Sequence, residues 1–191
     1  LAKVLTGPHA LVLPGAYDPL SAKLVEEAGF PAVYVGSYAA AAAGYGLPDV
    51  GALTLDEIAR HTKAPADAVS VPAVADAEGG FFERGNIWRT IDAFERAGVA
   101  AIHIEDHAGG KHTTLPQRLI PLEAMTQKLR AALDARCYSD LAIVARTDAI
   151  WATKNLDEAI ARLKAFEKIG VDYLFPTGAT PEMLREIRKH V

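Results

Sequence analysis

The sequence lacks the features that mark disulfide-bonded secreted proteins and membrane proteins. It contains one cysteine, Cys137, so no disulfide can form within the chain, which is typical of a reducing compartment. No run approaches the roughly 18 apolar residues of a membrane-spanning helix, and no signal peptide is visible. The chain begins at Leu1 rather than Met, which leaves room for a leader removed earlier. We therefore expect a cytoplasmic protein without a membrane partner.

A basic surface is also missing. The formal net charge is −4 and the isoelectric point is near 5.9, so we expect no nucleic-acid partner. The basic residues at 185, 188 and 189 fit one exposed helix face. Cys137 lies in "DARCYSD", between a predicted helix and a strand, and nothing near it in the sequence indicates a lowered thiol pKa. We therefore do not expect a catalytic thiol.

What the sequence does contain is a regular alternation of short apolar runs and amphipathic stretches. Half of the residues are hydrophobic, which is enough for a sizeable core. Helical spacing of apolar residues occurs in "DPLSAKLVEEAGF", "NIWRTIDAFERAGV" and "LDEAIARLKAFEKIGV". The short apolar runs predict strands at residues 11–13, 32–35, 73–75, 101–104, 142–145 and 173–175.

Three of the predicted helices end alike, in "EEAGF", "ERAGV" and "EKIGV". A glycine just beyond the last turn is a common left-handed helix cap. A strand follows each of them within a few residues, so the pattern is a βα repeat with parallel strands. Near-continuous apolar strands indicate that both faces of the sheet are covered.

Two architectures fit six parallel strands that alternate with helices: an open doubly wound sheet, or a (β/α)8 TIM-type barrel. A barrel needs eight strands and typically about 250 residues. We prefer a single α/β barrel domain over residues 1–191, in which about six of the eight βα units are present and which breaks off after the sixth strand. No linker or low-complexity segment suggests a second domain.

Acidic residues follow neighbouring predicted strands. Asp76 and Glu78 lie in "ADAEGG" after the third strand, and Glu105 lies in "HIEDH" after the fourth. Because the chemistry of a βα barrel gathers at the carboxyl ends of its strands, these acids should converge. Oxygen-only ligands suit Mg²⁺ or Mn²⁺ better than zinc. The alternative is that each acid caps the helix that follows its strand.

Cationic residues are expected to complete this site. Arg146, in "ARTDA" after the fifth strand, predicts a bidentate anion clamp, although an ion pair with Asp148 or Glu105 is the alternative. Lys111 follows the flexible "HAGG", so we expect either a lid lysine that closes on a substrate or a solvated loop lysine. Asp49 is not explained by helix capping and could reach the site, whereas His103 is expected to be a satisfied core histidine.

Several motifs in order resemble the isocitrate lyase and phosphoenolpyruvate mutase superfamily. They are "YVGSYAAAAAGYGLPDVGALTLDEI", "PAVADAEGGF", "GVAAIHIEDHAGGK" and "LAIVARTDA", and the resemblance covers almost the whole chain. It implies a (β/α)8 barrel, a homotetramer that swaps its last helix, and bound Mg²⁺. It also implies a small 2-oxo or 2-hydroxy carboxylate substrate, and cleavage or formation of a C–C or P–C bond through an enolate.

The resemblance carries over residue by residue. Asp76 and Glu105 match the metal-site acids, with Asp49 and Glu78 near them. Arg146 matches the substrate-binding arginine, and Lys111 matches the lysine of the gating loop. Gly36, Ser37 and Tyr38 match the turn that holds the substrate carboxylate, and Tyr34 just before them is also expected to bind the substrate.

The departures from the family pattern bear on the reaction. Thr113 stands where lyases of this family have a cysteine that acts as the general acid, and a threonine hydroxyl is a far weaker acid than a thiol. Glu78, Phe82 and Thr177 replace the aspartate, glycine and glutamate that are usual at their positions. We expect a Mg²⁺-dependent lyase that cleaves a C–C bond, with Lys111, Thr113, Arg146 and Asp49 as catalytic residues. The alternatives are a phosphonomutase or phosphonopyruvate hydrolase acting on a P–C bond, and a non-catalytic barrel.

Overall fold

Five parallel strands form one sheet in a computed structural model that describes residues 1, 10–138 and 140–191. The strands are β1 (Val33–Val35), β2 (Ala73–Asp76), β3 (Ala101–Glu105), β4 (Ala142–Thr147) and β5 (Tyr173–Pro176). Their order in space follows their order in the chain, and every neighbouring pair is parallel. This order agrees with barrel winding, since a doubly wound sheet reverses its strand order partway along.

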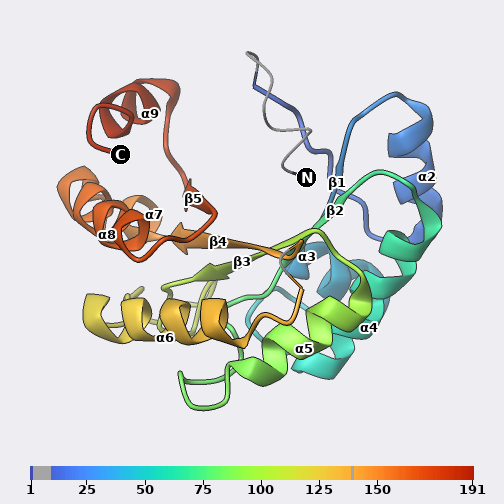
Figure 1. Ribbon diagram of the computed structural model, residues 1–191, viewed down its shortest axis with the longest axis horizontal. Coiled ribbons are helices and arrows are strands. Elements are labelled where there is room, and N and C mark those ends of the chain that lie inside the picture. Colours follow the sequence, from blue (N-terminus) through green and yellow to red (C-terminus); the bar gives the residue numbers. More distant parts are fainter. Residues whose placement is uncertain (2–9, 139) are drawn as a thin grey trace.

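The helices lie on one side of this sheet. They are α2 (Pro19–Glu27), α4 (Leu55–Ala68), α5 (Trp88–Ala97), α6 (Leu122–Ala135), α7 (Ala149–Thr153), α8 (Leu156–Lys168) and α9 (Pro181–Ile187). Two further short helices, α3 (Ser37–Ala39) and the π-helix η1 (Ala40–Tyr45), follow the carboxyl end of β1. In Figure 1 the helices α2, α4, α5, α6 and α8 follow one another around the outside of the curved strands, and each contacts the next. A doubly wound fold would cover both faces with helices, so the barrel-type prediction is confirmed.

The strand predicted at residues 11–13 is wrong. Val12 is 65% exposed, and the chain meets the sheet only afterwards, through a single bridge between Gly15 and Tyr34. Tyr34 N donates to Pro14 O at 2.9 Å, and Ala16 N donates to Tyr34 O at 2.8 Å. Pro14 has no N–H of its own to extend the ladder, so the expected strand is reduced to one pair.

The predicted glycine caps are confirmed. Gly29, Gly98 and Gly170 have φ of 84°, 75° and 82°, the left-handed region that ends a helix without strain only at glycine. Each of these glycines turns the chain from an outer helix back toward the next strand. The repeat "helix, glycine, strand" in the sequence therefore sets the spacing of the βα units.

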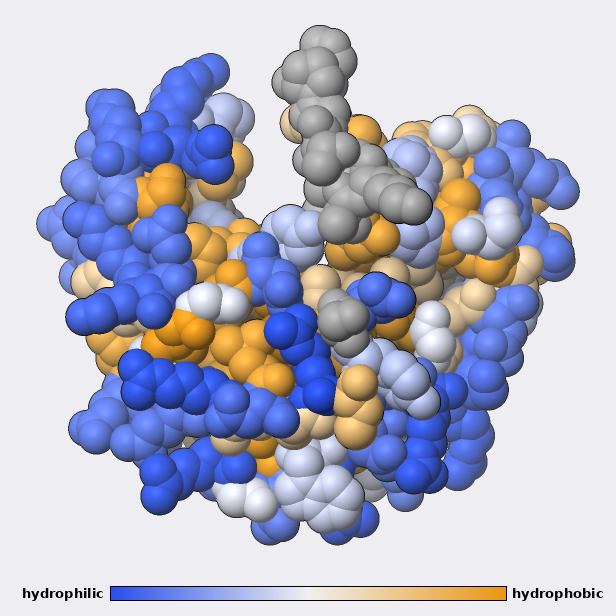
Figure 2. Space-filling view, in the orientation of Figure 1, coloured by the Kyte–Doolittle hydropathy of each residue, from blue (hydrophilic) through white to orange (hydrophobic). Residues whose placement is uncertain are grey.

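The two faces of the sheet have opposite character. On the helix side, Ile102 and Ile104 of β3 and Ile143 of β4 are fully buried against residues such as Phe94 of α5 and Phe166 of α8. In Figure 2 the helices show a mainly blue, hydrophilic surface, and orange residues are visible between them toward the strands. Among the helices that the structure describes, none has both the length and the apolar character needed to cross a bilayer.

On the other face the register aligns polar side chains. Asp76 of β2 pairs with His103 of β3, and Glu105 of β3 pairs with Arg146 of β4, which in turn pairs with Phe175 of β5. Because side chains alternate across a strand, His103 and Glu105 point to the same side, away from the isoleucines. This polar face, near the carboxyl ends of the strands, carries the candidate site.

Candidate active site at the carboxyl ends of the strands

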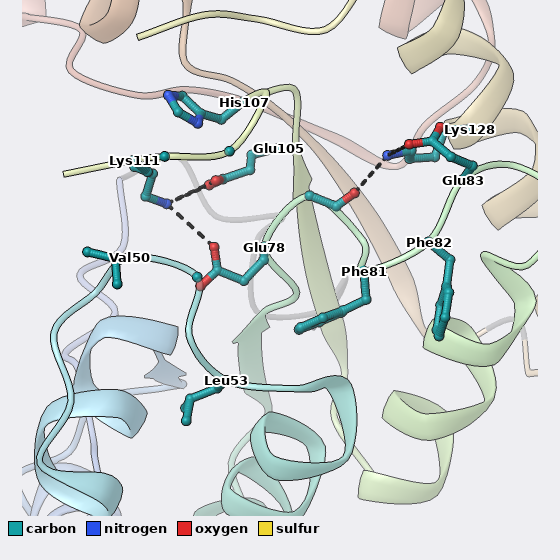
Figure 3. A pocket seen from close by; sticks show the side chains of 14 residues that line it. Val50, Leu53, Glu78, Phe81, Phe82, Glu83, Glu105, His107, Lys111 and Lys128 are labelled. Carbon is teal, nitrogen blue, oxygen red and sulfur yellow. Dashed lines mark hydrogen bonds and ion pairs between the residues drawn. The ribbon is translucent and has the colours of Figure 1, made fainter. Parts of the chain in front are cut away.

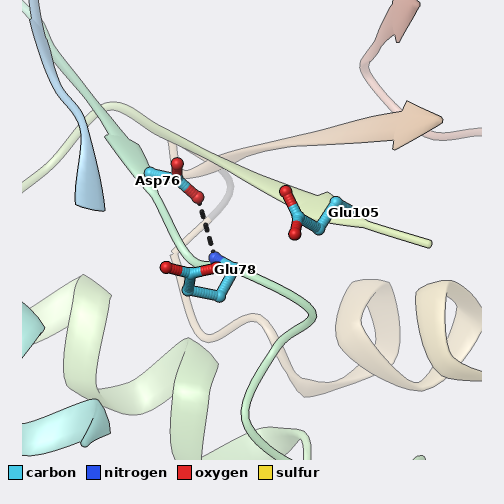
Figure 4. Close-up of side chains that lie close together, drawn as sticks. All are labelled: Asp76, Glu78 and Glu105. Atoms are coloured by element: carbon cyan, nitrogen blue, oxygen red, sulfur yellow. Dashed lines mark hydrogen bonds between the residues drawn. The ribbon is translucent and has the colours of Figure 1, made fainter. Parts of the chain in front are cut away.

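Three carboxylates meet beyond the ends of β2 and β3. Asp76 is the last residue of β2, Glu105 is the last of β3, and Glu78 follows β2 by two residues. One oxygen from each lies within 4.8 Å of the others. Figure 4 shows the three side chains close together. Neither Asp76 nor Glu105 caps the helix that follows it, since α5 begins after Ile87 and α6 after Pro121. The convergence predicted from the strand ends is present, and the capping alternative is wrong for these two acids.

Glu78 reaches this cluster through an uncommon backbone conformation. Its φ is 50°, in the left-handed region that non-glycine residues rarely adopt. Its N–H donates to Asp76 Oδ1 at 2.9 Å, and its carbonyl accepts from Glu105 N at 2.9 Å. These two hydrogen bonds hold Glu78 between the other acids, and strain of this kind concentrates at functional sites.

Two cations face the carboxylates. Lys111 Nζ lies 3.0 and 2.9 Å from the two oxygens of Glu105 and 3.8 Å from Glu78. Arg146 Nη2 lies 3.1 Å from Glu105 Oε2, and Nη1 lies 3.8 Å from Asp76 Oδ2. Lys111 is 7% exposed, so it is not the solvated loop lysine that was the alternative. Arg146 also makes the structural ion pairs weighed as its alternative, with Glu105 and, at 2.8 Å, with Asp148.

Burial and neighbouring charges shift the protonation of the acids. Burial raises the pKa of Glu105 to about 8, and the attraction of Arg146 and Lys111 only partly opposes this. Burial and the charge of Asp76 also raise the pKa of Glu78. Burial acts the same way on Asp76, but attraction to His103, Arg146 and Lys111 outweighs it and holds the Asp76 pKa below its usual value. Burial and the repulsion between neighbouring carboxylates therefore disfavour the state in which all three acids are ionised.

Tyr34, Ser37 and His103 complete the polar face around Asp76. Ser37 Oγ donates to Asp76 Oδ2 at 3.0 Å, and Tyr34 OH lies 3.4 Å from the same oxygen. Tyr34 OH is also 2.7 Å from His103 Nε2. The prediction that His103 is buried is confirmed, but it is not fully satisfied: its Nδ1 has no hydrogen-bond partner among the residues that the structure describes and lies 3.6 Å from Asp76 Oδ1. Its spacing of two residues from Glu105 was the signal for this position.

Other predicted site residues lie at the edge of this cluster. Asp49 lines a small cavity together with Glu78, whose pKa its charge helps to raise, and its Oδ2 lies 3.3 Å from His112 Nε2. Thr113 is exposed, and its hydroxyl donates to Gly110 O at 2.6 Å. Tyr38 is 67% exposed. At Gly36 an added Cβ would lie 3.1 Å from the Tyr34 ring. Asp49 thus lies beside the cluster of acids, Thr113 and Tyr38 are not part of it, and the functional roles of all four residues stay predictions.

A cavity of about 270 Å³ adjoins the acids. Its wall includes Glu78, Glu105 and Lys111 on one side and Val50, Leu53 and Phe81 on another, as Figure 3 shows. The cluster is therefore reachable by a small molecule. Cys137 is exposed, and its N–H is bonded to Glu95 at the opposite end of the strands, so the thiol is remote from this site.

The donor set fits a hard divalent cation. It consists of carboxylate oxygens, two of them almost fully buried, and their mutual repulsion is relieved by positive charge. Carboxylate sites with room for water are typical of Mg²⁺. Asp76, Glu78 and Glu105 are the residues that would hold the ion.

Comparison with known proteins agrees with this geometry. The family description "Phosphoenolpyruvate phosphomutase" matches residues 1–191. The chain belongs to this family. Within it, the chain is similar to 2,3-dimethylmalate lyase of Eubacterium barkeri (38% identity, covering 92% of this chain and 61% of the relative). It is also similar to oxaloacetate decarboxylase of Bradyrhizobium sp. strain ORS 278 (38% identity, 94% and 62%).

A solved family structure is similar over nearly the whole chain. It is a phosphonopyruvate hydrolase in complex with oxalate and Mg²⁺, with a TM-score of 0.85, 31% identity, and coverage of 98% of this chain and 65% of that one. This chain spans about three fifths of the length of the curated family members that it matches (61% and 62% of the two named above). The family relationship confirms the superfamily predicted from the motifs.

Proposed function

We propose that this protein is a Mg²⁺-dependent lyase that cleaves a C–C bond of a small 2-oxo or 2-hydroxy carboxylic acid through an enolate. The observation that carries the proposal is the meeting of Asp76, Glu78 and Glu105 at one place that faces the guanidinium of Arg146. Family members named as lyase and decarboxylase support C–C chemistry.

The ion and the cations of the chain have separate tasks in this proposal. Bound Mg²⁺ supplies positive charge that stabilises the enolate oxygen as it develops. Arg146 binds the carboxylate of the substrate, because a guanidinium stays charged when buried and offers paired donors. Its alignment by Asp148 before the substrate arrives reduces the reorganisation needed in the transition state.

Lys111 is the proposed proton carrier. Burial lowers the pKa of the Lys111 ammonium, but the charge of Glu105 outweighs this and raises it above its usual value, so it is protonated at neutral pH. Lys111 follows Gly109 and Gly110, both with left-handed φ (86° and 72°), in a loop whose movement would exclude water. Thr113 lies in the same loop and has no acid strength comparable with a thiol. We therefore assign Thr113 a steric role in loop closure.

The proposal is tested by a panel of 2-oxo and 2-hydroxy di- and tricarboxylates with Mg²⁺, followed by release of the 2-oxo product. We expect one acid to be cleaved in Mg²⁺ and none in excess EDTA. Binding of oxalate with Mg²⁺ but no turnover of any acid would favour a non-catalytic barrel and contradict the proposal.

P–C bond chemistry is the second candidate. It is favoured by the likeness to phosphonopyruvate hydrolase and by threonine at position 113 in place of the lyase cysteine. Phosphonopyruvate followed by phosphorus NMR separates the candidates. Release of inorganic phosphate, or rearrangement to a phosphate ester, would replace the C–C proposal.

A further inference from the structure

The two adjacent carboxylates at the end of β3 serve opposite sides of the sheet. Glu105 points to the cluster of acids, whereas Asp106 is fully buried on the side of the outer helices. Asp106 Oδ1 accepts from Asp148 N at 2.9 Å, and its Oδ2 accepts from Thr147 Oγ1 at 2.7 Å. Asp106 thus connects the end of β3 to the end of β4.

An arginine of α8 holds this carboxylate. Arg162 Nη1 lies 3.2 Å from Asp106 Oδ2 and also donates to Ile120 O at 3.1 Å. Its other nitrogens bond Glu158 one turn earlier in the helix, at 3.0 and 3.2 Å. Arg162 is 7% exposed, so its planar donor group is fixed by three acceptors.

The same connection reaches Arg146. Asp148, whose backbone N–H is held by Asp106, uses its side chain to accept from Arg146 Nε at 2.8 Å and from Nη2 at 3.3 Å. Within the described part of the chain, no other donor bonds the Asp148 carboxylate. Glu105 and Asp76 attract the same guanidinium, at 3.1 and 3.8 Å, so without Asp148 these two acids would set its orientation.

We propose that Arg162 is a positioning residue that, through Asp106 and Asp148, fixes the guanidinium of Arg146 in the orientation that binds the substrate carboxylate. The positioning itself stands on the contacts above, and its effect on substrate rests on the function proposed for Arg146. Arg162 touches neither the acids of the cluster nor the cavity beside them. Its effect on a substrate would therefore be exerted through Arg146.

The chain offers a matched control in Arg136. Arg136 Nη1 donates to Asp172 Oδ2 at 2.8 Å and to Leu141 O at 2.9 Å, and the same Asp172 oxygen accepts from Ile143 N at 2.8 Å. Like Arg162, Arg136 bonds one backbone carbonyl and one carboxylate that itself accepts a backbone N–H, but it lacks the second carboxylate that Glu158 provides to Arg162. It lies at the amino end of β4, remote from Arg146.

The test compares Arg162→Met with Arg136→Met. The first readout is hydrogen exchange of the Arg146 Nε–H, followed by NMR and assigned by its disappearance in Arg146→Lys. We expect exchange to become about tenfold faster in Arg162→Met, as the loss of one well-placed hydrogen bond implies, and to stay unchanged in Arg136→Met. The second readout is turnover: KM should rise about tenfold in Arg162→Met alone, with kcat little changed.

Arg162→Lys covers the case in which Arg162→Met does not fold, because it keeps the charge but loses the planar fork. It should give an intermediate increase in exchange and KM. The proposal is overturned if Arg162 variants leave the Arg146 Nε–H as protected as Arg136→Met does. If the parent protein turns over no acid, the proposed function fails, while the exchange measurement still decides whether Arg162 positions Arg146.

Discussion

At the carboxyl ends of β2, β3 and β4 the charged side chains face one another, whereas at the amino ends Glu26 and Glu95 each bond the backbone of a connecting loop. Glu26 Oε1 accepts from Ser70 N at 2.8 Å and from Val71 N at 3.2 Å, just before β2. Glu95 Oε1 accepts from the N–H groups of Cys137 and Tyr138, both at 2.8 Å, before β4. These amino-end acids are satisfied locally and need no further partner.

The carboxyl-end acids differ because they compete for the same cations. Glu105 shares Lys111 with Glu78 and shares Arg146 with Asp76 and Asp148. Such an arrangement is costly for stability, since burial of like charges disfavours the folded state. A cost that appears at one end of the strands and not at the other indicates selection for chemistry at that end.

The largest effect is expected from Asp76→Ala. It removes a metal ligand and leaves His103 and Arg146 without their shared carboxylate. Metal-dependent turnover should fall about 1,000-fold or more, and Mn²⁺ binding measured by calorimetry should be lost. Asp172→Ala at the amino end is the control and should retain both. Turnover of Asp76→Ala at the parent rate would contradict the metal role of Asp76.

Arg146→Lys should produce the next largest effect. The ammonium keeps the charge but cannot make the paired contacts of a guanidinium with Asp148 and a substrate carboxylate. We expect kcat/KM to fall about 100-fold, mainly through KM, while Mn²⁺ affinity changes little. A loss of metal affinity equal to that of Asp76→Ala would show that Arg146 supports the metal site instead of the substrate.

Most of the difference between the two ends of the strands could be predicted from the sequence. The strand ends and the glycine caps follow from local patterns, and parallel strands bring Asp76 and Glu105 to one edge regardless of detail. The failed strand at residues 11–13 had the right apolar residues, but Pro14 limited its pairing. The position of Asp49 against His112 depends on two long loops, and no local pattern predicts how such loops fold.

The position of His103 on the polar face, beside Asp76, was not predicted, and the reason is different. A histidine within a buried strand is usually part of the core, and the alternation that places it on the same face as Glu105 was not used. The same alternation separates Glu105 from Asp106, which accounts for two adjacent acids at the end of one strand. Burial alone is thus a weak predictor in a barrel, because both faces of the sheet are buried and only one is apolar.

Lys111→Met should separate the chemistry from metal binding. Without the ammonium, Glu105 and Glu78 lose a counter-charge, so Mn²⁺ should bind at least as tightly as to the parent protein. Turnover should nevertheless fall about 10- to 100-fold, because the proposed proton carrier is gone. Weaker metal binding in this variant would mean that Lys111 helps to build the metal site. Lys63→Met, in an exposed pair with Asp67, is the control and should change neither property.

At the amino end, Asp172→Ala should affect stability but not chemistry. The change removes the acceptor for Ile143 N and the partner of Arg136. The free energy of unfolding in urea should fall by about 2 kcal/mol, with kcat/KM within about twofold of the parent. A large loss of activity in a folded Asp172→Ala protein would remove the functional distinction between the two ends.

The smallest effect is the pH dependence due to His103. Burial holds the pKa of His103 at about 4, although the charge of Asp76 opposes this. Between about pH 6.5 and 5.5 the unfolded chain takes up a proton at this histidine and the folded chain does not, so its contribution to stability falls as the pH falls, by about 1 kcal/mol. His103→Gln has no titrating group at this position. The unfolding free energy of the parent minus that of the variant, measured in EDTA, should therefore fall by about 1 kcal/mol between about pH 6.5 and 5.5.

Glu105 has the opposite effect on stability, but the parent and His103→Gln both contain it, so its contribution cancels from the difference between their unfolding free energies. The pKa of about 8 leaves folded Glu105 protonated in this range, while the unfolded chain releases the proton, so this group favours the folded state increasingly as the pH falls. Parallel stability curves for parent and His103→Gln would contradict this prediction, because folded His103 would then take up its proton over the same pH range as the unfolded chain. Asp76, 3.6 Å from the unpaired Nδ1, would then hold an imidazolium, and the polar face would carry one more cation than its burial favours.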